Sequence, residues 1–280
     1  MKTVLATLLF FLHLSAFTQD TNFFVFLCFG QSNMEGFPGI KDEDKGPVDA
    51  RFQVLAAVDF PGLGRTKGNW YPAVPPLCRP SSGLSPADYF GRTLVAHLPP
   101  AVKVGIVSVA VAGCKIELFG KGTFQSYAAT APDWMTNIIH AYNGNPYQRL
   151  VESARLAQKA GVIKGILLHQ GESNTGDKEW PGKVKGVYEN LLKDLHLNAR
   201  EVPLICGELV SADQHGACAS MNAIIDRLQD TIPTSHVVFS SGCEGRPDHL
   251  HFTPAGYREL GKRYAECLLP LLGDKWPASQ

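Results

Sequence analysis

The sequence predicts an α/β protein with a mostly parallel sheet and helices on both of its faces. Short apolar runs rich in Phe, Val, Ile and Leu are typical of strands buried on both faces, and they alternate with stretches of helical periodicity. Such alternation favours parallel strands joined by crossover helices. No internal repeat or linker interrupts the pattern, so one domain is expected over residues 22–272.

Five strands are expected, and each is an apolar run bounded by turn residues. The first runs from Phe23 to Phe29 and stops at Gly30. The other four are expected at 102–110, 162–168, 203–210 and 236–240. Residues 51–55 fit a short edge strand, whereas the aromatic segment at 70–72 is expected to be an ordered loop.

Five helices are expected between and after these strands. Three begin with a cap residue followed by proline at the first helical position, at Ser85, Asn145 and Thr253. The spacing of Tyr188 and Leu191 predicts another helix with one apolar face. The expected ranges are 86–98, 146–160, 184–195, 220–228 and 254–268.

The first residues predict a signal peptide over residues 1–18. Lys2 supplies the positive charge, an apolar stretch follows, and Ser15 and Ala16 provide small side chains near a cleavage point. No later apolar run approaches the length of a membrane span. The mature chain is therefore expected to be secreted or periplasmic, without a membrane span.

Composition narrows the function classes. Among 280 residues, 26 Lys and Arg balance 26 Asp and Glu, so nothing predicts a basic nucleic-acid surface. The seven cysteines include no CxxC pair, which argues against a zinc ribbon. Bridges between Cys206 and Cys218, or between Cys218 and Cys243, are both compatible with the sequence.

Polar turn motifs follow the predicted strands and should converge at one edge of the sheet. Ser32 lies just past the first strand, where ligands bind in open α/β sheets. If a helix begins there, its unpaired N–H groups and dipole would stabilise an oxyanion. A serine at this position is also common as a simple helix cap.

The last polar loop contains Asp248 and His251, at a spacing that suits acyl transfer. A carboxylate three residues before an imidazole can reach its Nδ1 atom, and the imidazole can then take a proton from a serine hydroxyl. His249 is a second candidate base. A metal site of Asp248, His249 and His251, or a plain capped loop, are the competing interpretations.

Four of these features together resemble the SGNH hydrolase superfamily. They are GQSNM at 30–34, Gly113, HQGES at 169–173 and the Asp248-x-x-His251 pair. More narrowly, they resemble the sialate O-acetylesterase domain and carbohydrate esterase family 6, the acetylxylan esterases. The resemblance spans about residues 22–268 and implies a three-layer α/β/α, flavodoxin-like fold with a five-stranded sheet. It also implies removal of acetyl groups from sugar hydroxyls without a metal or other cofactor.

The resemblance also implies roles for individual residues. Ser32 corresponds to the nucleophile, His251 to the general base and Asp248 to its orienting acid. The backbone N–H groups of Ser32 and Gly113 correspond to oxyanion donors.

The remaining motif residues are candidates for binding the oxyanion or the substrate. The usual asparagine donor of the superfamily is absent, because Ser173 stands at its position. The amide of Gln170 is expected to replace it, and Gln31 is a further candidate. Glu172 has three possible roles: sharing the orientation of His251, pairing with a nearby cation, or bracing its loop.

The expected function is an exported serine esterase acting on an acetylated oligo- or polysaccharide, such as acetylxylan, with O-acetyl sialic acid as the substrate variant. Trp70, Tyr71, Trp134 and Trp180 offer faces for stacking sugars, or they anchor loops. A non-catalytic carbohydrate-binding domain and a lipase-like esterase are the competing functions.

Overall fold

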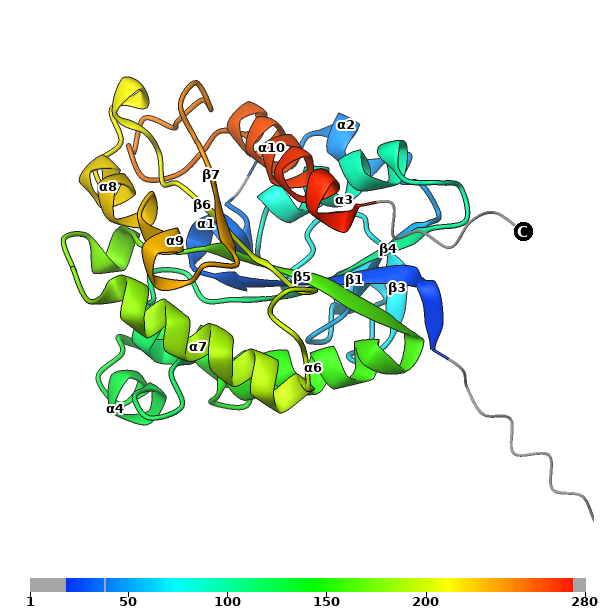
Figure 1. Ribbon diagram of the computed structural model, residues 1–280, viewed down its shortest axis with the longest axis horizontal. Helices are drawn as coiled ribbons and strands as arrows, with labels where there is room; N and C mark the ends of the chain where they lie inside the picture. Colours follow the sequence, from blue (N-terminus) through cyan, green and yellow to red (C-terminus); the bar gives the residue numbers. More distant parts are fainter. Residues whose placement is uncertain (1–18, 38, 274–280) are drawn as a thin grey trace, which may run out of the picture.

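Seven strands form one sheet in the computed structural model, which describes residues 19–37 and 39–273 (Figure 1). Their order across the sheet is β3-β2-β4-β1-β5-β6-β7, and every neighbouring pair is parallel except β2 with β3. The signal peptide expected at 1–18 lies outside the described residues. The strands are β1 (Asp20–Gly30), β2 (Phe52–Leu55), β3 (Trp70–Pro72), β4 (Lys103–Ala110), β5 (Gly161–His169), β6 (Leu204–Gly207) and β7 (Ser235–Val238).

The five strands that the sequence predicts are adjacent, in the order β4-β1-β5-β6-β7. Numbered among themselves, they follow the order 2-1-3-4-5 of flavodoxin-like sheets. Strands β4 and β5 lie on opposite sides of β1, so the order in which successive strands are added to the sheet reverses at β1. A ligand site is expected outside the carboxyl ends of β1 and β5, at this switch point.

The prediction of five strands was wrong, because two short strands extend the sheet beyond β4. Residues 51–55 do contain a strand, β2, but it lies between β4 and β3 rather than at the edge. The expected loop at 70–72 is β3, which pairs antiparallel with β2 through Leu55 and Trp70. Three residues are too few to show the alternation that identifies a strand.

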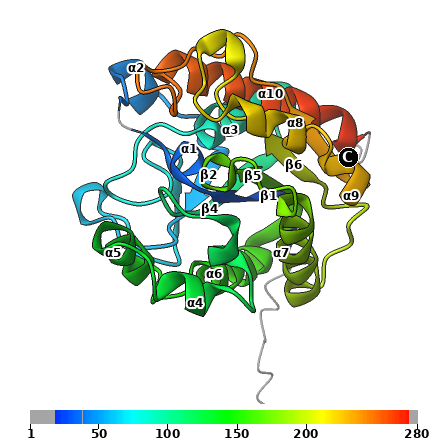
Figure 2. The same cartoon turned by 90° about the vertical axis from the view of Figure 1, so that its left-hand side faces the viewer.

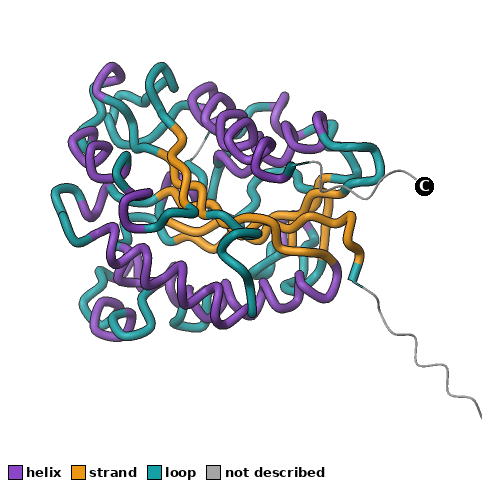
Figure 3. Tube along the Cα trace, in the orientation of Figure 1, coloured by secondary structure: helices purple, strands orange, loops and turns teal. Residues whose placement is uncertain are grey.

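Helices cover both faces of the sheet (Figures 1 and 2). In both views α3 and α10 lie on one side, and α6 and α7 lie on the other. The tube drawn in Figure 3 shows the strands running between these two groups. The helices are α1 (Ser32–Glu35), α2 (Asp42–Lys45), α3 (Pro86–His97), α4 (Phe124–Ala128), α5 (Asp133–Ala141), α6 (Pro146–Ala160), α7 (Trp180–Leu195), α8 (Asn222–Ile225), α9 (Leu228–Thr231) and α10 (Pro254–Leu272).

The three predicted caps are confirmed by their hydrogen bonds. Asn145 accepts from Gln148 N at 3.0 Å, and Thr253 accepts from Gly256 N at 3.2 Å. At the start of α3, the Asp88 carboxylate reaches back to Ser85 N at 2.9 Å. Each cap fixes where the chain turns from a loop into a helix that packs on the sheet.

Three of the five expected helices differ from the prediction by more than one residue. Helix α10 continues to Leu272 rather than ending at Leu268. Helix α7 begins at Trp180 rather than at Val184, because Pro181 lies in a first turn where no N–H donor is needed. The helix expected at 220–228 is broken into short α8 and α9. The Asn222 side chain bonds both the N–H and the carbonyl of Leu209, which ties this segment to the loop after β6.

The domain contains no disulfide bridge among its seven cysteines. All seven cysteines are free, so neither of the two suggested bridges is formed. Within residues 19–37 and 39–273, no helix combines the length and the apolar character needed to cross a membrane.

Candidate active site

Ser32 lies directly beyond the carboxyl end of β1, at the start of α1, which faces the viewer in Figure 2. Gln31 N donates to His169 O at 3.1 Å, so the chain stays attached to the end of β5 until it turns into the helix. A Cβ atom at Gly30 would lie 2.1 Å from His169 O, and only glycine fits this close approach. The turn therefore fixes Ser32 at the predicted switch point.

Ser32, His251 and Asp248 form one hydrogen-bonded series. The distance from Ser32 Oγ to His251 Nε2 is 2.9 Å, and that from His251 Nδ1 to Asp248 Oδ2 is 3.0 Å. The other oxygen, Asp248 Oδ1, accepts from the backbone N–H groups of Leu250 and His251 at 2.9 and 3.0 Å. A hydroxyl, an imidazole and a carboxylate in this order are the arrangement that serine hydrolases use.

The surroundings of Asp248 favour its ionised form. Partial burial raises its pKa, but the hydrogen bonds from His251 and Leu250 outweigh this effect and hold the pKa below its usual value. An ionised carboxylate beside Nδ1 keeps the ring proton there, which leaves Nε2 free to accept the proton of Ser32. The tautomer that a general base needs is thus set by the loop itself.

His249 does not take part in this series. Its backbone has a φ of 61°, and its ring centroid lies 6.2 Å from that of His215. Among the described residues, no group of three or more His, Cys, Asp or Glu side chains is arranged to hold a metal ion. The interpretation of this loop as a metal site is therefore not supported.

Ser32 and Gly113 line the same cavity from different loops, and each has a backbone N–H group without an acceptor among the described residues. Ser32 is the first residue of α1, so its N–H has no partner within the helix. Near Gly113, Ala112 N donates to Glu35 Oε2 at 2.7 Å and Cys114 N donates to Val111 O at 3.2 Å. No described residue accepts from the intervening Gly113 N–H.

Gly113 is held in a conformation that few other residues adopt. Its φ is 68°, and its carbonyl accepts from Ser173 Oγ at 2.8 Å. A Cβ atom there would lie 2.5 Å from the Trp134 ring. Both strain and packing therefore require glycine at this position.

The structure contradicts the expectation that Gln170 is the third oxyanion donor. Its side chain is buried, and its Nε2 atom donates to Gln31 Oε1, Cys114 O and Asn174 Oδ1 at 3.1, 3.2 and 2.8 Å. Its Oε1 atom accepts from Trp180 Nε1 at 2.5 Å. With every amide atom engaged away from the cavity, Gln170 supports its neighbours instead.

Gln31, rather than Gln170, reaches the cavity. It lines the cavity beside Ser32, and its Oε1 accepts from Gln170 Nε2 and from the N–H groups of Gly171 and Ser173. These bonds engage the amide oxygen of Gln31, whereas its amide nitrogen makes no such bond. No acceptor for that nitrogen is found among the described residues, so it is available to a ligand.

Glu172 braces the site and does not contact the imidazole of His251. Its Oε1 accepts from Asn33 Nδ2 at 2.5 Å, whereas Asp248 holds the ring of His251. Burial raises the pKa of Glu172 from 4.5 to about 7, and the bond from Asn33 only partly opposes this shift. Its Oε2 is buried and has no hydrogen-bond partner among the described residues.

Asn33, which the sequence analysis did not single out, joins three segments around Ser32. Its Nδ2 donates to Leu250 O at 2.9 Å as well as to Glu172, and its Oδ1 accepts from Tyr257 Oη at 2.6 Å. The residue is fully buried. Its position in the GQSNM motif, directly after Ser32, is the sequence feature that could have indicated a role in the site.

Three further residues line the cavity, and the sequence analysis did not predict them either. Glu35 is buried and forms an ion pair with Arg79, while its second oxygen holds Ala112 N. Phe37 stacks on His251 with ring centroids 3.8 Å apart and an interplanar angle of 16°. Phe37 and Arg79 lie in Gly- and Pro-rich loops, where no periodicity predicts a contact.

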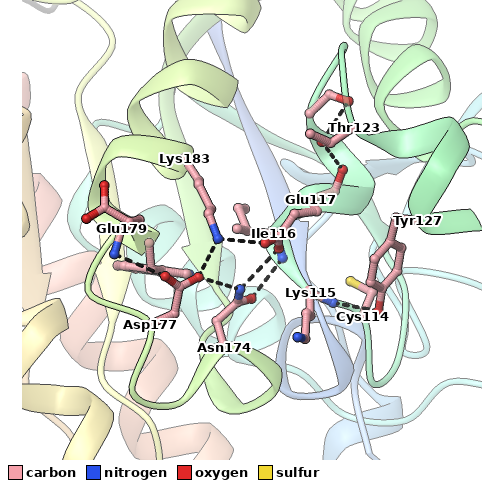
Figure 4. A network of polar contacts seen from close by, with 12 residues as sticks. Cys114, Lys115, Ile116, Glu117, Thr123, Tyr127, Asn174, Asp177, Glu179 and Lys183 are labelled. Carbon is pink, nitrogen blue, oxygen red and sulfur yellow. Dashed lines mark hydrogen bonds and ion pairs between the residues drawn. The ribbon is translucent and has the colours of Figure 1, made fainter.

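A polar network centred on Asn174 supports the loops from outside the cavity (Figure 4). Asn174 Oδ1 accepts from Ile116 N at 2.9 Å, and its Nδ2 donates to Glu117 and Asp177 at 3.1 and 3.2 Å. Lys183 of α7 bonds both carboxylates, at 2.7 and 2.6 Å. The network fixes the segment after Gly113 against the loop after β5.

The site opens into a cavity of about 440 Å³, within the range of small-molecule sites. Trp134 and Leu250 both line it and are 53% and 37% exposed. Trp180, by contrast, is fully buried in α7 and cannot contact a sugar.

The parallel sheet and the Ser–His–Asp series at its carboxyl edge place the chain in the structural class of α/β serine hydrolases. Within that class, residues 22–270 match the family model for "Carbohydrate esterase, sialic acid-specific acetylesterase". The chain belongs to this family, as the motifs predict, and is a carboxylic ester hydrolase.

Solved structures with similar folds agree over most of the chain. A protein from Arabidopsis thaliana has a TM-score of 0.68 at 21% identity, covering 90% of this chain and 99% of its own. NanS has a TM-score of 0.64 at 20% identity, with 90% and 98% covered. A carbohydrate acetylesterase from Xanthomonas citri has a TM-score of 0.58 at 18% identity, with 86% and 55% covered. At these identities the likeness concerns the fold.

Proposed function

We propose that the protein is an exported serine esterase that removes O-acetyl groups from carbohydrates through an acetyl-enzyme intermediate. The observation that carries the proposal is the unbroken series from Ser32 Oγ to His251 at 2.9 Å and on to Asp248 at 3.0 Å. Membership of a carbohydrate esterase family supports the reaction class. The Xanthomonas citri neighbour, described as a carbohydrate acetylesterase, supports the choice of acetyl esters.

In the first half-reaction, Ser32 Oγ attacks the acetyl carbonyl carbon while His251 Nε2 takes the hydroxyl proton. Asp248 stabilises the imidazolium that forms. The tetrahedral intermediate then collapses, His251 returns the proton to the departing sugar oxygen, and the acetyl group remains on Ser32.

The second half-reaction repeats these steps with water. His251 removes a proton from the water as its oxygen attacks the acetyl carbonyl. Collapse of the second tetrahedral intermediate breaks the bond to Ser32 Oγ, which recovers its proton from His251. Acetate leaves, and the free enzyme is restored.

Three donors support the oxyanion in this scheme. Two are the N–H groups of Ser32 and Gly113, which come from different loops. The third is Gln31 Nε2, because Gln170 and the neighbouring backbone fix the opposite end of that amide. Losing one such donor typically costs about 3 kcal/mol of barrier.

The proposed substrate is an acetylated carbohydrate. We expect acetylxylan or a related acetylated glycan, with O-acetyl sialic acid as the variant that the family name supports. Export rests on the sequence of residues 1–18 alone. Acetate release from a panel of acetylated xylo-oligosaccharides and O-acetyl sialic acids ranks the substrates, and p-nitrophenyl acetate against the octanoate ester tests the lipase-like function.

The direct test replaces Ser32 by alanine and measures acetate release and thermal unfolding together. Ser32→Ala should abolish turnover and leave unfolding nearly unchanged, because the hydroxyl contributes one partly buried hydrogen bond. Ser126→Ala, in the exposed helix α4, is the matched control and should retain full activity. Turnover that survives in Ser32→Ala would refute the mechanism.

A further inference from the structure

Trp134 is a large apolar side chain left open at the rim of the catalytic cavity. It is the second residue of α5 and is 53% exposed, although it lines the same cavity as Ser32. Single exposed apolar residues are common on protein surfaces. This one differs because its position is tied to the proposed chemistry.

The indole lies against the loop that supplies an oxyanion donor. A Cβ built on Gly113 would meet Trp134 Cη2 at 2.5 Å and Cζ2 at 3.4 Å, so the six-membered part of the indole packs over that residue. One part of the indole is therefore anchored beside the position of the acetyl carbonyl. The rest of the indole is free to contact the alcohol part of the acetyl ester.

Polar side chains line the cavity as well, beside apolar ones such as Phe37 and Leu250. Ser81, Arg79 and Ser173 line the cavity with Trp134. Arg79 donates to Ser81 Oγ and is paired with the buried Glu35, so its guanidinium is held in place. The cavity thus combines apolar surface, including the flat face of Trp134, with several hydrogen-bonding groups.

We propose that Trp134 is the platform on which the sugar ring of the acetylated substrate stacks, and that it selects pyranosyl acetates over acetates of small alkyl alcohols. This inference rests on the proposed acetylesterase function. A pyranose has a face of C–H groups that suits an indole and a rim of hydroxyls that suits polar side chains. A linear acyl or alkyl chain has no hydroxyl groups to offer to polar side chains such as Ser81 and Arg79.

Trp134 is a specificity-determining residue, so its removal should affect acetylated glycans far more than small esters. In Trp134→Ala and Trp134→Leu, KM for an acetylated xylo-oligosaccharide should rise about tenfold, as expected for losing one aromatic stacking partner. Trp134→Phe keeps a flat face and should lose less. For ethyl acetate, which has no ring to stack, kcat/KM should fall much less than for the glycan.

Phe239→Ala is the matched control, because Phe239 is 61% exposed but does not line the cavity. This variant should leave kcat/KM unchanged for both the glycan and ethyl acetate. Equal losses of kcat/KM on the glycan and on ethyl acetate in Trp134→Ala would overturn the inference, because Trp134 would then act only by packing on Gly113. An unchanged KM for the glycan would overturn it as well.

Binding to the inactive protein separates this inference from the proposed function. Calorimetry with the acetylated xylo-oligosaccharide and Ser32→Ala protein should show binding that weakens about tenfold when Trp134→Ala is added. If the wild type cleaves no acetyl ester, the function fails while this measurement still decides the role of Trp134. Equal affinity of the two proteins would contradict the stacking.

Discussion

At the scale of single residues, the site depends on contacts between positions far apart in the chain. Ser32 and His251 are separated by 219 positions, yet their side chains are 2.9 Å apart. The motif spacing predicted both residues and Asp248, because acyl transfer requires these three groups and the sheet brings the loops together. It did not predict which glutamine faces the cavity, because Gln31 and Gln170 both lie at strand ends and only packing orients their amides.

Asp248→Asn should slow acetate release far more than Glu172→Gln. An amide cannot fix the tautomer of His251 as the carboxylate does, and a loss of about 10³- to 10⁴-fold in kcat is typical. Glu172 touches Asn33 and leaves the imidazole alone, so its amide variant should lose much less. Steady-state kinetics of the two variants against one acetyl ester decides the matter, and the reverse ranking would transfer the orienting role to Glu172.

Glu172 should also make folding stability depend on pH. Its pKa rises from 4.5 to about 7 on folding, so its favourable contribution is complete below the unfolded pKa and is lost as pH rises through about 7. The free energy of unfolding of the wild type should therefore fall relative to that of Glu172→Gln between these limits, by up to about 3 kcal/mol. Urea unfolding of both proteins at a series of pH values measures this difference in free energy. A difference that stays constant with pH would contradict the prediction.

At the scale of elements, long segments with strong patterns were predictable and short ones were not. The capped helices α3, α6 and α10 begin where Ser85, Asn145 and Thr253 indicate. Strand β3 has three residues, and its pairing with β2 depends on a partner that local sequence does not reveal. Helices α8 and α9 are equally short, and the side chain of Asn222 sets their position through tertiary hydrogen bonds.

The network around Asn174 predicts an effect of a distant lysine on the active-site loops. Lys183→Met should lower the free energy of unfolding by about 1 kcal/mol, because Glu117 and Asp177 lose a shared, partly exposed partner. It should also lower kcat, since Asn174 holds both Ile116 N and Gln170. Urea unfolding and kinetics measure the two effects.

Lys185→Met on the same helix is the control. Its distance to Glu189 is 3.9 Å and both side chains are exposed, so the change should stay within about 0.5 kcal/mol. If the Lys183 and Lys185 variants behave alike, the network does not support the site.

At the scale of the whole molecule, packing rather than covalent bridges holds the domain together. All seven cysteines are free, and five of them are buried. The sheet separates two apolar clusters, one beneath α6 and α7 and one beneath α3 and α10. Mostly parallel sheets need this cover on both faces.

Dithiothreitol should therefore leave the thermal midpoint of unfolding unchanged. Calorimetry with and without the reductant measures it, and titration of the denatured protein should find all seven thiols. A midpoint that falls in the reductant would show that a bridge stabilises the mature protein.

The central claim is that Ser32 is a nucleophile activated by His251 and Asp248. The most direct measurement is labelling with a serine-reactive phosphonate, followed by peptide mass mapping. The label should appear on Ser32, be absent in Ser32→Ala and form much more slowly in His251→Ala. An unlabelled Ser32 in a folded protein would contradict the claim and favour a carbohydrate-binding domain without catalysis.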